Sequence, residues 1–141
     1  MYKFPEIGVS FFLTADEFNL DYITIKMGII PTEARTKDDF PCQDFAHTSW
    51  SIDILEEECY TVEKPFDKLL GLLDGKEKII ISLCEELGIK ASFSIVIHMN
   101  SGRNPEIVLS NKIISFASSI NAHEIGFDIY SYEIDEIVVI E

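Results

Sequence analysis

Alternation of large apolar side chains with mostly polar ones is the feature that most restricts the folds open to this chain. In residues 91–98, Phe93, Ile95 and Ile97 alternate with serine, valine and histidine. Successive side chains of a strand point to opposite faces, so this spacing predicts a strand with one apolar face. The same pattern recurs in residues 7–14, 47–54 and 125–132. Strands of this kind predict a sheet that is covered on one side only.

Apolar residues at helical spacing predict helices between these strands. Residues 20–27 have Asn19 as a candidate N-cap and Gly28 at the C-terminal end. Two helical stretches, separated by a glycine, lie within residues 66–87. A last helix is expected to begin at Ser110. Its apolar stripe consists of Ile113, Ile114, Ala117 and Ile120.

The remaining segments carry weaker patterns. Two prolines predict a long irregular connection over residues 29–42, and residues 56–65 suggest a charged connector. A short strand is expected at Ile107 to Leu109, after a turn at residues 100–105. The end of the chain, Glu133 to Ile140, resembles an extra strand or the edge of a dimer.

The order of these elements predicts one domain, residues 1–141, of the α+β class. We expect a two-layer sandwich, with a mixed, mostly antiparallel sheet of about five strands and helices on one face. A chain of 141 residues is long enough to bury a substantial core.

The charge of the chain restricts its partners. It has 11 Lys and Arg residues against 25 Asp and Glu residues, for a formal net charge of −14. Such a chain repels nucleic-acid phosphates and anionic lipids, so we expect neither nucleic-acid nor membrane binding. A basic protein partner would be attracted, which favours a protein partner of that charge, although acidity also serves solubility.

Cysteine spacing and the N-terminus favour a cytoplasmic location. Cys42, Cys59 and Cys84 are widely spaced, which disfavours a disulfide framework or a zinc ribbon. No apolar run approaches the ~20 residues that a membrane helix needs, and acidic residues interrupt the region where a signal peptide would lie.

Catalytic and cofactor motifs are missing from the sequence. It has no Gly-x-Gly-x-x-Gly or Walker pattern, no Gly-x-Ser-x-Gly elbow and no His-Glu-x-x-His pair. We therefore expect no catalytic residues, no metal ligands and no cofactor, and an enzyme is the less favoured interpretation.

Candidate binding residues lie on the sheet face away from the helices, which collects polar and aromatic side chains. They are Trp50, Asp53, His98, Asp128, Tyr130 and Tyr132. Tyr130 with Trp50 could form a stacking wall, and Asp128 with His98 could form an acid–base pair or bind a metal. An ordinary solvated sheet face is the simpler interpretation of the same pattern.

Several segments together resemble the bacterial domain-of-unknown-function family 4279. The strongest are Leu20-Asp-x-x-Ile-Thr leading into Gly28-x-x-Pro-Thr, and the closing Phe127-Asp-Ile-Tyr. Ser49-Trp-Ser and Ile107-Val-Leu-Ser before a helix add to the likeness, which spans nearly the whole chain. The resemblance implies one cytoplasmic domain and no known activity. Some small acidic bacterial domains are immunity partners of toxins, which is an analogy only.

Two functions remain open at this point. The first is a non-enzymatic protein-interaction domain that binds a basic partner through its acidic surface or open sheet face. The second is a small-molecule or metal-dependent enzyme that uses Asp53, His98, Asp128 and Tyr130, which requires these side chains to meet in one pocket. A homodimer through the C-terminal strand is compatible with both.

Overall fold

The computed structural model describes residues 5–39 and 47–133. These residues form five strands, four α-helices and one short 3₁₀-helix, η1. In chain order the elements are β1 (Glu6–Ala15), α1 (Leu20–Met27), β2 (Glu33–Arg35), η1 (Lys37–Asp39), β3 (Thr48–Glu58), α2 (Glu63–Leu73), α3 (Glu77–Leu87), β4 (Lys90–Asn100), α4 (Asn111–Ser119) and β5 (Glu124–Tyr132).

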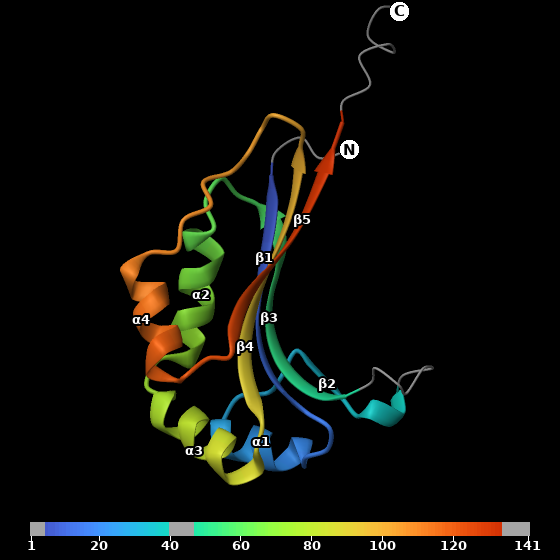
Figure 1. Cartoon of the computed structure of the whole chain (residues 1–141), viewed down its shortest axis with the longest axis vertical. Helices are drawn as coiled ribbons and strands as arrows, with labels where there is room; N and C mark the ends of the chain where they lie inside the picture. The colour runs from blue at the N-terminus through green and yellow to red at the C-terminus, as the bar shows by residue number, and fades with distance from the viewer. Residues whose placement is uncertain (1–4, 40–46, 134–141) are drawn as a thin grey trace, which may run out of the picture.

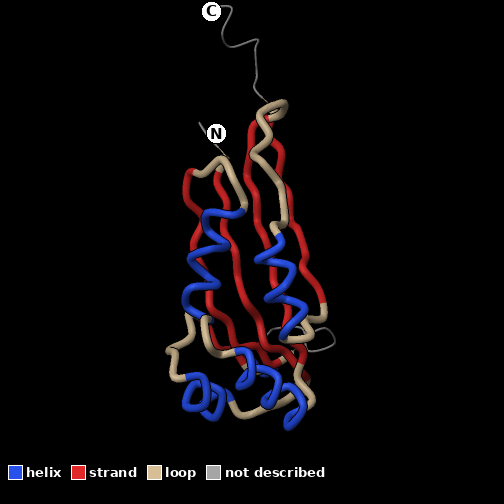
Figure 2. Tube along the Cα trace, turned by 90° about the vertical axis from the view of Figure 1, so that its left-hand side faces the viewer, coloured by secondary structure: helices blue, strands red, loops and turns tan. Residues whose placement is uncertain are grey.

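The strands form one mixed sheet in the order β2-β3-β1-β4-β5. The β4–β5 pair is parallel and the other three pairs are antiparallel. Figure 1 shows α2 and α4 on one face of this sheet, with α1 and α3 at one end. In Figure 2 the same two helices lie side by side over the strands. The predicted α+β fold, a mixed sheet with helices on one face, is confirmed.

Apolar side chains on the helix-facing side of the sheet form the core. Ile7, Phe11 and Leu13 of β1 are completely buried, as the alternation predicted. The rings of Phe11 and Phe66 lie 5.4 and 5.2 Å from the ring of Phe93, measured between centroids. These contacts join β1, β4 and α2, so burial of aromatic surface fixes α2 on the sheet.

Local capping explains both ends of α1, the end of α3 and the start of α4. Asn19 accepts a hydrogen bond from the Tyr22 amide at 3.1 Å at the start of α1, and Gly28 ends that helix in the left-handed conformation. Gly88 ends α3 in the same way. Ser110 caps α4 through the Ile113 amide. The predicted boundaries of α1 and α3 are therefore confirmed at these residues.

Four predictions about individual segments were wrong. The irregular connection contains β2, which forms because it pairs with β3, and the charged residues 56–58 continue β3. Ile107–Leu109 forms no strand, because the chain makes only a single bridge there, between Glu106 and Thr61. Ile114 leaves the apolar stripe of α4 and is 51% exposed.

Two of the predicted segments extend beyond the residues that the structure describes. Residues 134–140 of the predicted C-terminal strand lie outside the described residues, as do residues 40–42 of the predicted connection and the four residues that follow them. Among the helices of the described residues, none is long and apolar enough to cross a bilayer.

Candidate functional site

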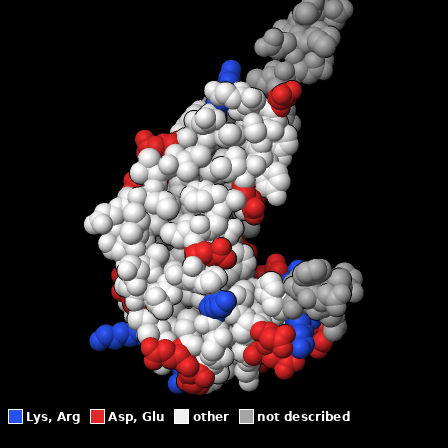
Figure 3. Space-filling view, viewed as in Figure 1, with Lys and Arg blue, Asp and Glu red and all other residues white. Residues whose placement is uncertain are grey.

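The candidate site is the face of the sheet that points away from the helices, called here the open face. Strand register places Ser10 opposite both Asp53 of β3 and Ser94 of β4. Between β4 and β5, Asp128 lies opposite Val96 and Tyr130 lies opposite His98. The strands bend so that this face is concave, and Figure 3 shows the molecule hollowed on the side away from α2 and α4.

Trp50 does not belong to the open face, so its predicted position there was wrong. Its side chain is completely buried on the helix-facing side. The indole Nε1 donates a hydrogen bond to Thr24 Oγ1 of α1 at 3.0 Å. Alternation along β3 places Trp50 with the core residue Ile52, and a buried indole needs such a partner for its N–H group. Trp50 therefore cannot stack with Tyr130.

Acidic residues predominate on the open face of the described strands. Seven acidic side chains lie there against two basic ones. The acidic residues are Glu6, Glu33, Asp53, Glu56, Glu58, Glu124 and Asp128, and the basic residues are Arg35 and Lys90. Carboxylates gathered on a concave surface create a negative potential that attracts cationic groups.

A cluster of polar and aromatic groups surrounds His98 on this face. Its Nδ1 lies 2.9 Å from the Tyr132 hydroxyl, and its Nε2 lies 3.3 Å from a Glu56 carboxylate oxygen. The Tyr130 ring stacks on the imidazole, with centroids 4.9 Å apart and planes 12° apart. The imidazole is therefore held between groups from β3 and β5, which gives this end of the open face a defined shape.

A β-bulge brings Glu56 to His98. The register between β1 and β3 shifts between Ile7 and Val9, so that Gly8 lies against residues 55 and 56. A Cβ atom on Gly8 would come within 2.8 Å of Glu56 Cγ and 3.1 Å of the Glu56 amide nitrogen. Close approach of the two strands therefore requires glycine at this position. Sequence reasoning missed Glu56, and the isolated glycine inside a strand was the signal that could have revealed the bulge.

A shallow depression of about 480 Å³ lies beside this bulge. It is lined by Gly8, Ser10, Asp53, Ile54, Leu55, Glu56 and Val96. Of the four residues considered for catalysis, Asp53 lines it, whereas His98, Asp128 and Tyr130 do not. Two strands lie between β3 and β5, which separates Asp53 from the β5 side chains by about 14 Å at the usual strand spacing.

The structure thus brings His98, Tyr130 and Tyr132 together and leaves Asp53 apart. Asp128 is two residues from Tyr130 on the same face of β5. Within residues 5–39 and 47–133, no three His, Cys, Asp or Glu side chains are placed to hold a metal ion. The enzyme interpretation required Asp53, His98, Asp128 and Tyr130 to meet in one pocket. In the structure they do not.

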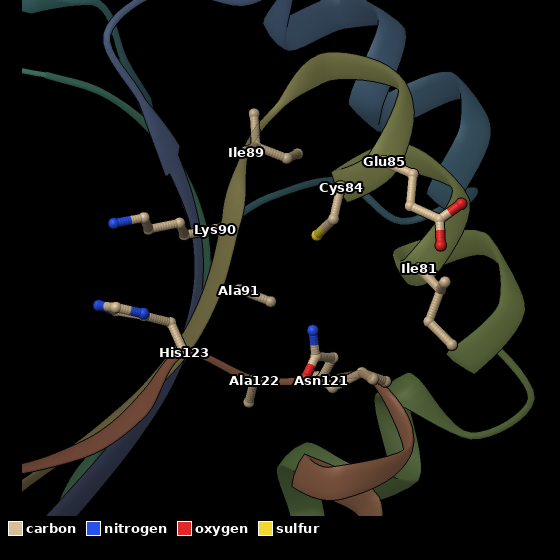
Figure 4. A pocket seen from close by; sticks show the side chains of 10 residues that line it. Ile81, Cys84, Glu85, Ile89, Lys90, Ala91, Asn121, Ala122 and His123 are labelled. Atoms are coloured by element: carbon tan, nitrogen blue, oxygen red, sulfur yellow. The ribbon is translucent and has the colours of Figure 1, made fainter.

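A second cavity, of about 450 Å³, lies at the other end of the sheet between α3 and β4. Figure 4 shows the Cys84 thiol and the Asn121 side chain directed into it, while Lys90 and His123 point away from Cys84. Burial raises the pKa of the Cys84 thiol, and the nearby Glu85 raises it further. A thiol with a raised pKa stays protonated near neutral pH and is a poor nucleophile, which agrees with a structural role for Cys84.

Comparison with known proteins gives one match. The family model described as "Domain of unknown function (DUF4279)" matches residues 5–132, which includes all five strands and all four α-helices. Neither a search of curated proteins nor a search of solved structures found a match. Since the family model covers nearly the whole chain, the chain belongs to the DUF4279 family.

Proposed function

We propose that this chain is a non-enzymatic protein-interaction domain whose open face binds a basic partner. The observation that carries the proposal is the excess of carboxylates on a concave face that none of the described helices covers. Complementary charge speeds encounter and selects against partners of the wrong sign. The net charge of −14 also attracts a basic partner, at longer range.

The aromatic groups of the open face provide a second support. Tyr130 is 49% exposed although it stacks on His98, and Tyr132 is also partly exposed. Tyrosine is enriched among the residues that contribute most to protein interfaces, because its ring buries a large area and loses little conformational freedom. An acidic surface with exposed tyrosines therefore suits a partner that offers arginine or lysine.

Capture of the partner with paired charge variants tests this proposal. One variant carries Asp53→Lys and Glu58→Lys on the open face of β3. The matched control carries Asp74→Lys and Glu85→Lys, which are exposed carboxylates after α2 and on α3. Both variants change the net charge equally. The test uses each protein as immobilised bait in the native lysate, at 50 and at 500 mM NaCl.

We expect one basic protein to be retained by the wild type and by the control, and to be lost from the open-face variant. High salt should weaken its retention, because ionic strength screens exposed charges. Equal retention by all three baits, or loss from the control alone, would contradict the proposal. An acidic partner would contradict it as well.

A further inference from the structure

Strand β5 is the outermost strand of the described sheet and pairs there with β4 alone. In a parallel pair, a strand directs only alternate backbone groups toward its neighbour, so the other amides and carbonyls of β5 point outward. Its nine residues contain no proline, lysine or arginine, the residues that usually prevent another strand from adding at an edge. The outer edge of β5 is therefore suited to accept one more strand.

The two faces of β5 differ in chemistry. On the helix-facing side, Phe127 and Ile129 remain 40% and 48% exposed. On the open face, Asp128 and Tyr130 lie two residues apart. An added strand would place its own side chains beside these two rows in alternation, because residues opposite one another share a face. One of its rows would meet apolar groups, and the other would meet a carboxylate and an aromatic ring.

Charge decides which strand can occupy this edge. β5 carries Glu124 and Asp128 and no basic side chain, so a second copy would bring an equally acidic strand alongside. Like charges that face one another across a strand pair are destabilising. With a net charge of −14 on each chain, two copies also repel at longer range. The edge is therefore better matched to a basic strand than to another copy of this chain.

We propose that the outer edge of β5 binds an extended segment of a partner protein in which basic and apolar residues alternate. The basic side chains lie on the open face, where the Asp128 carboxylate and the ring of Tyr130 hold them by charge and by a cation–π contact. The apolar side chains cover Phe127 and Ile129, and backbone hydrogen bonds extend the sheet by one strand. This inference rests on the proposed interaction function and specifies how the partner is bound.

Two synthetic peptides of identical composition test the inference with the full chain. In one, arginine and valine alternate over ten residues; in the other, five arginines precede five valines. Calorimetric titration at 150 mM NaCl should show the alternating peptide binding at least ten times more tightly. Hydrogen exchange should then slow at amides of β5. Equal affinity for the two peptides, or slower exchange only outside β5, would overturn the inference.

Paired variants extend the same test to the apolar row. Phe127→Ser with Ile129→Ser should weaken binding of the alternating peptide at least tenfold. The control pair, Ile25→Ser with Leu72→Ser, removes two exposed apolar side chains from α1 and α2, 77% and 49% exposed, and should leave binding unchanged. Equal effects of the two pairs would overturn the inference.

Two other outcomes separate this inference from the proposed function. A basic partner whose capture depends on Asp53 and Glu58, combined with equal binding of the two peptides, would overturn the strand-addition inference and leave the proposed function in place. A dimer of the wild type in light scattering that is lost with Phe127→Ser and Ile129→Ser would assign the edge to a second copy, which also overturns the inference.

Discussion

Replacing Gly8 by alanine tests whether the bulge in β1 shapes the open face. The added Cβ would lie 2.8 Å from Glu56 Cγ and 3.1 Å from both the Glu56 amide nitrogen and the Ile54 carbonyl oxygen. Carbon atoms in contact normally lie about 3.5–4.0 Å apart. Two of the three contacts are with backbone, so rotation of the Glu56 side chain can relieve only one of them.

These contacts set the expected magnitude. Adding a methyl group to a closely packed site usually costs about 1–3 kcal/mol. The same substitution favours folding by about 0.4–1 kcal/mol, because alanine restricts the unfolded chain. The two effects together leave a net loss of roughly 0–2.6 kcal/mol, and because two of the three contacts are with backbone we exclude its low end and expect Gly8→Ala to lower the free energy of unfolding by about 1–2 kcal/mol. For a domain of this size, that corresponds to a fall in Tm of roughly 3–6 °C.

Urea unfolding followed by circular dichroism measures this change, with Gly71→Ala as the control. Gly71 lies in α2 and a Cβ there would meet nothing within 4 Å, so that substitution should stabilise the protein by about 0.4–1 kcal/mol. Adding Glu56→Ala to Gly8→Ala removes the 2.8 Å contact and should recover part of the loss. Unchanged or increased stability of Gly8→Ala would refute the reasoning, as would the absence of any recovery.

Three further predictions follow from single contacts. Trp50→Phe removes the hydrogen bond to Thr24 and should lower the free energy of unfolding by about 1–3 kcal/mol in urea titrations; no change would show that the indole N–H adds nothing. Because burial raises the pKa of its thiol, Cys84 should react with iodoacetamide at pH 7.5 much more slowly than in the urea-unfolded chain, and equal rates would contradict this. The hydrogen bond from Lys68 lowers the pKa of Glu57, so this pair stabilises the fold above about pH 4.5 and the stabilisation is lost as pH falls through the lowered value. Lys68→Met should reduce the acid sensitivity of unfolding in that range, and an unchanged pH profile would count against the pair.

Local signals were enough to predict much of this fold. Asn19 and Gly28 determined both ends of α1, because a capping side chain and a left-handed glycine act within a few residues. Alternation likewise predicted which residues of β4 are buried, with Phe93, Ile95 and Ile97 in the core. Such patterns are visible in sequence because the side chains that make them are neighbours in the chain.

Pairing between distant segments could not be predicted in the same way. The three residues of β2 are exposed and have no strand pattern, and they form a strand because β3 offers a partner. Residues 107–109 have the composition of a strand but lie beside no continuous partner. In both cases, the presence or absence of a neighbouring strand decides the structure, and the strand propensity of the segment itself does not.

The candidate site, like the fold, could be predicted from the sequence only in part. Tyr130 and Tyr132 were predicted on the open face from their spacing, and they lie there together with His98. Glu56 was missed because the bulge at Gly8 depends on how two strands meet. Trp50 was misplaced because a stacking role was inferred from its residue type, although its own alternation with Ile52 placed it in the core.

Hydrogen exchange of the whole chain, measured with and without its captured partner, tests most directly whether the open side of the sheet is the binding surface. We predict slower exchange at amides of β3 and β5 in the complex and unchanged exchange in α2 and α4. Slower exchange confined to α2 and α4 would contradict the account, because it would place the partner on the helical side of the sheet.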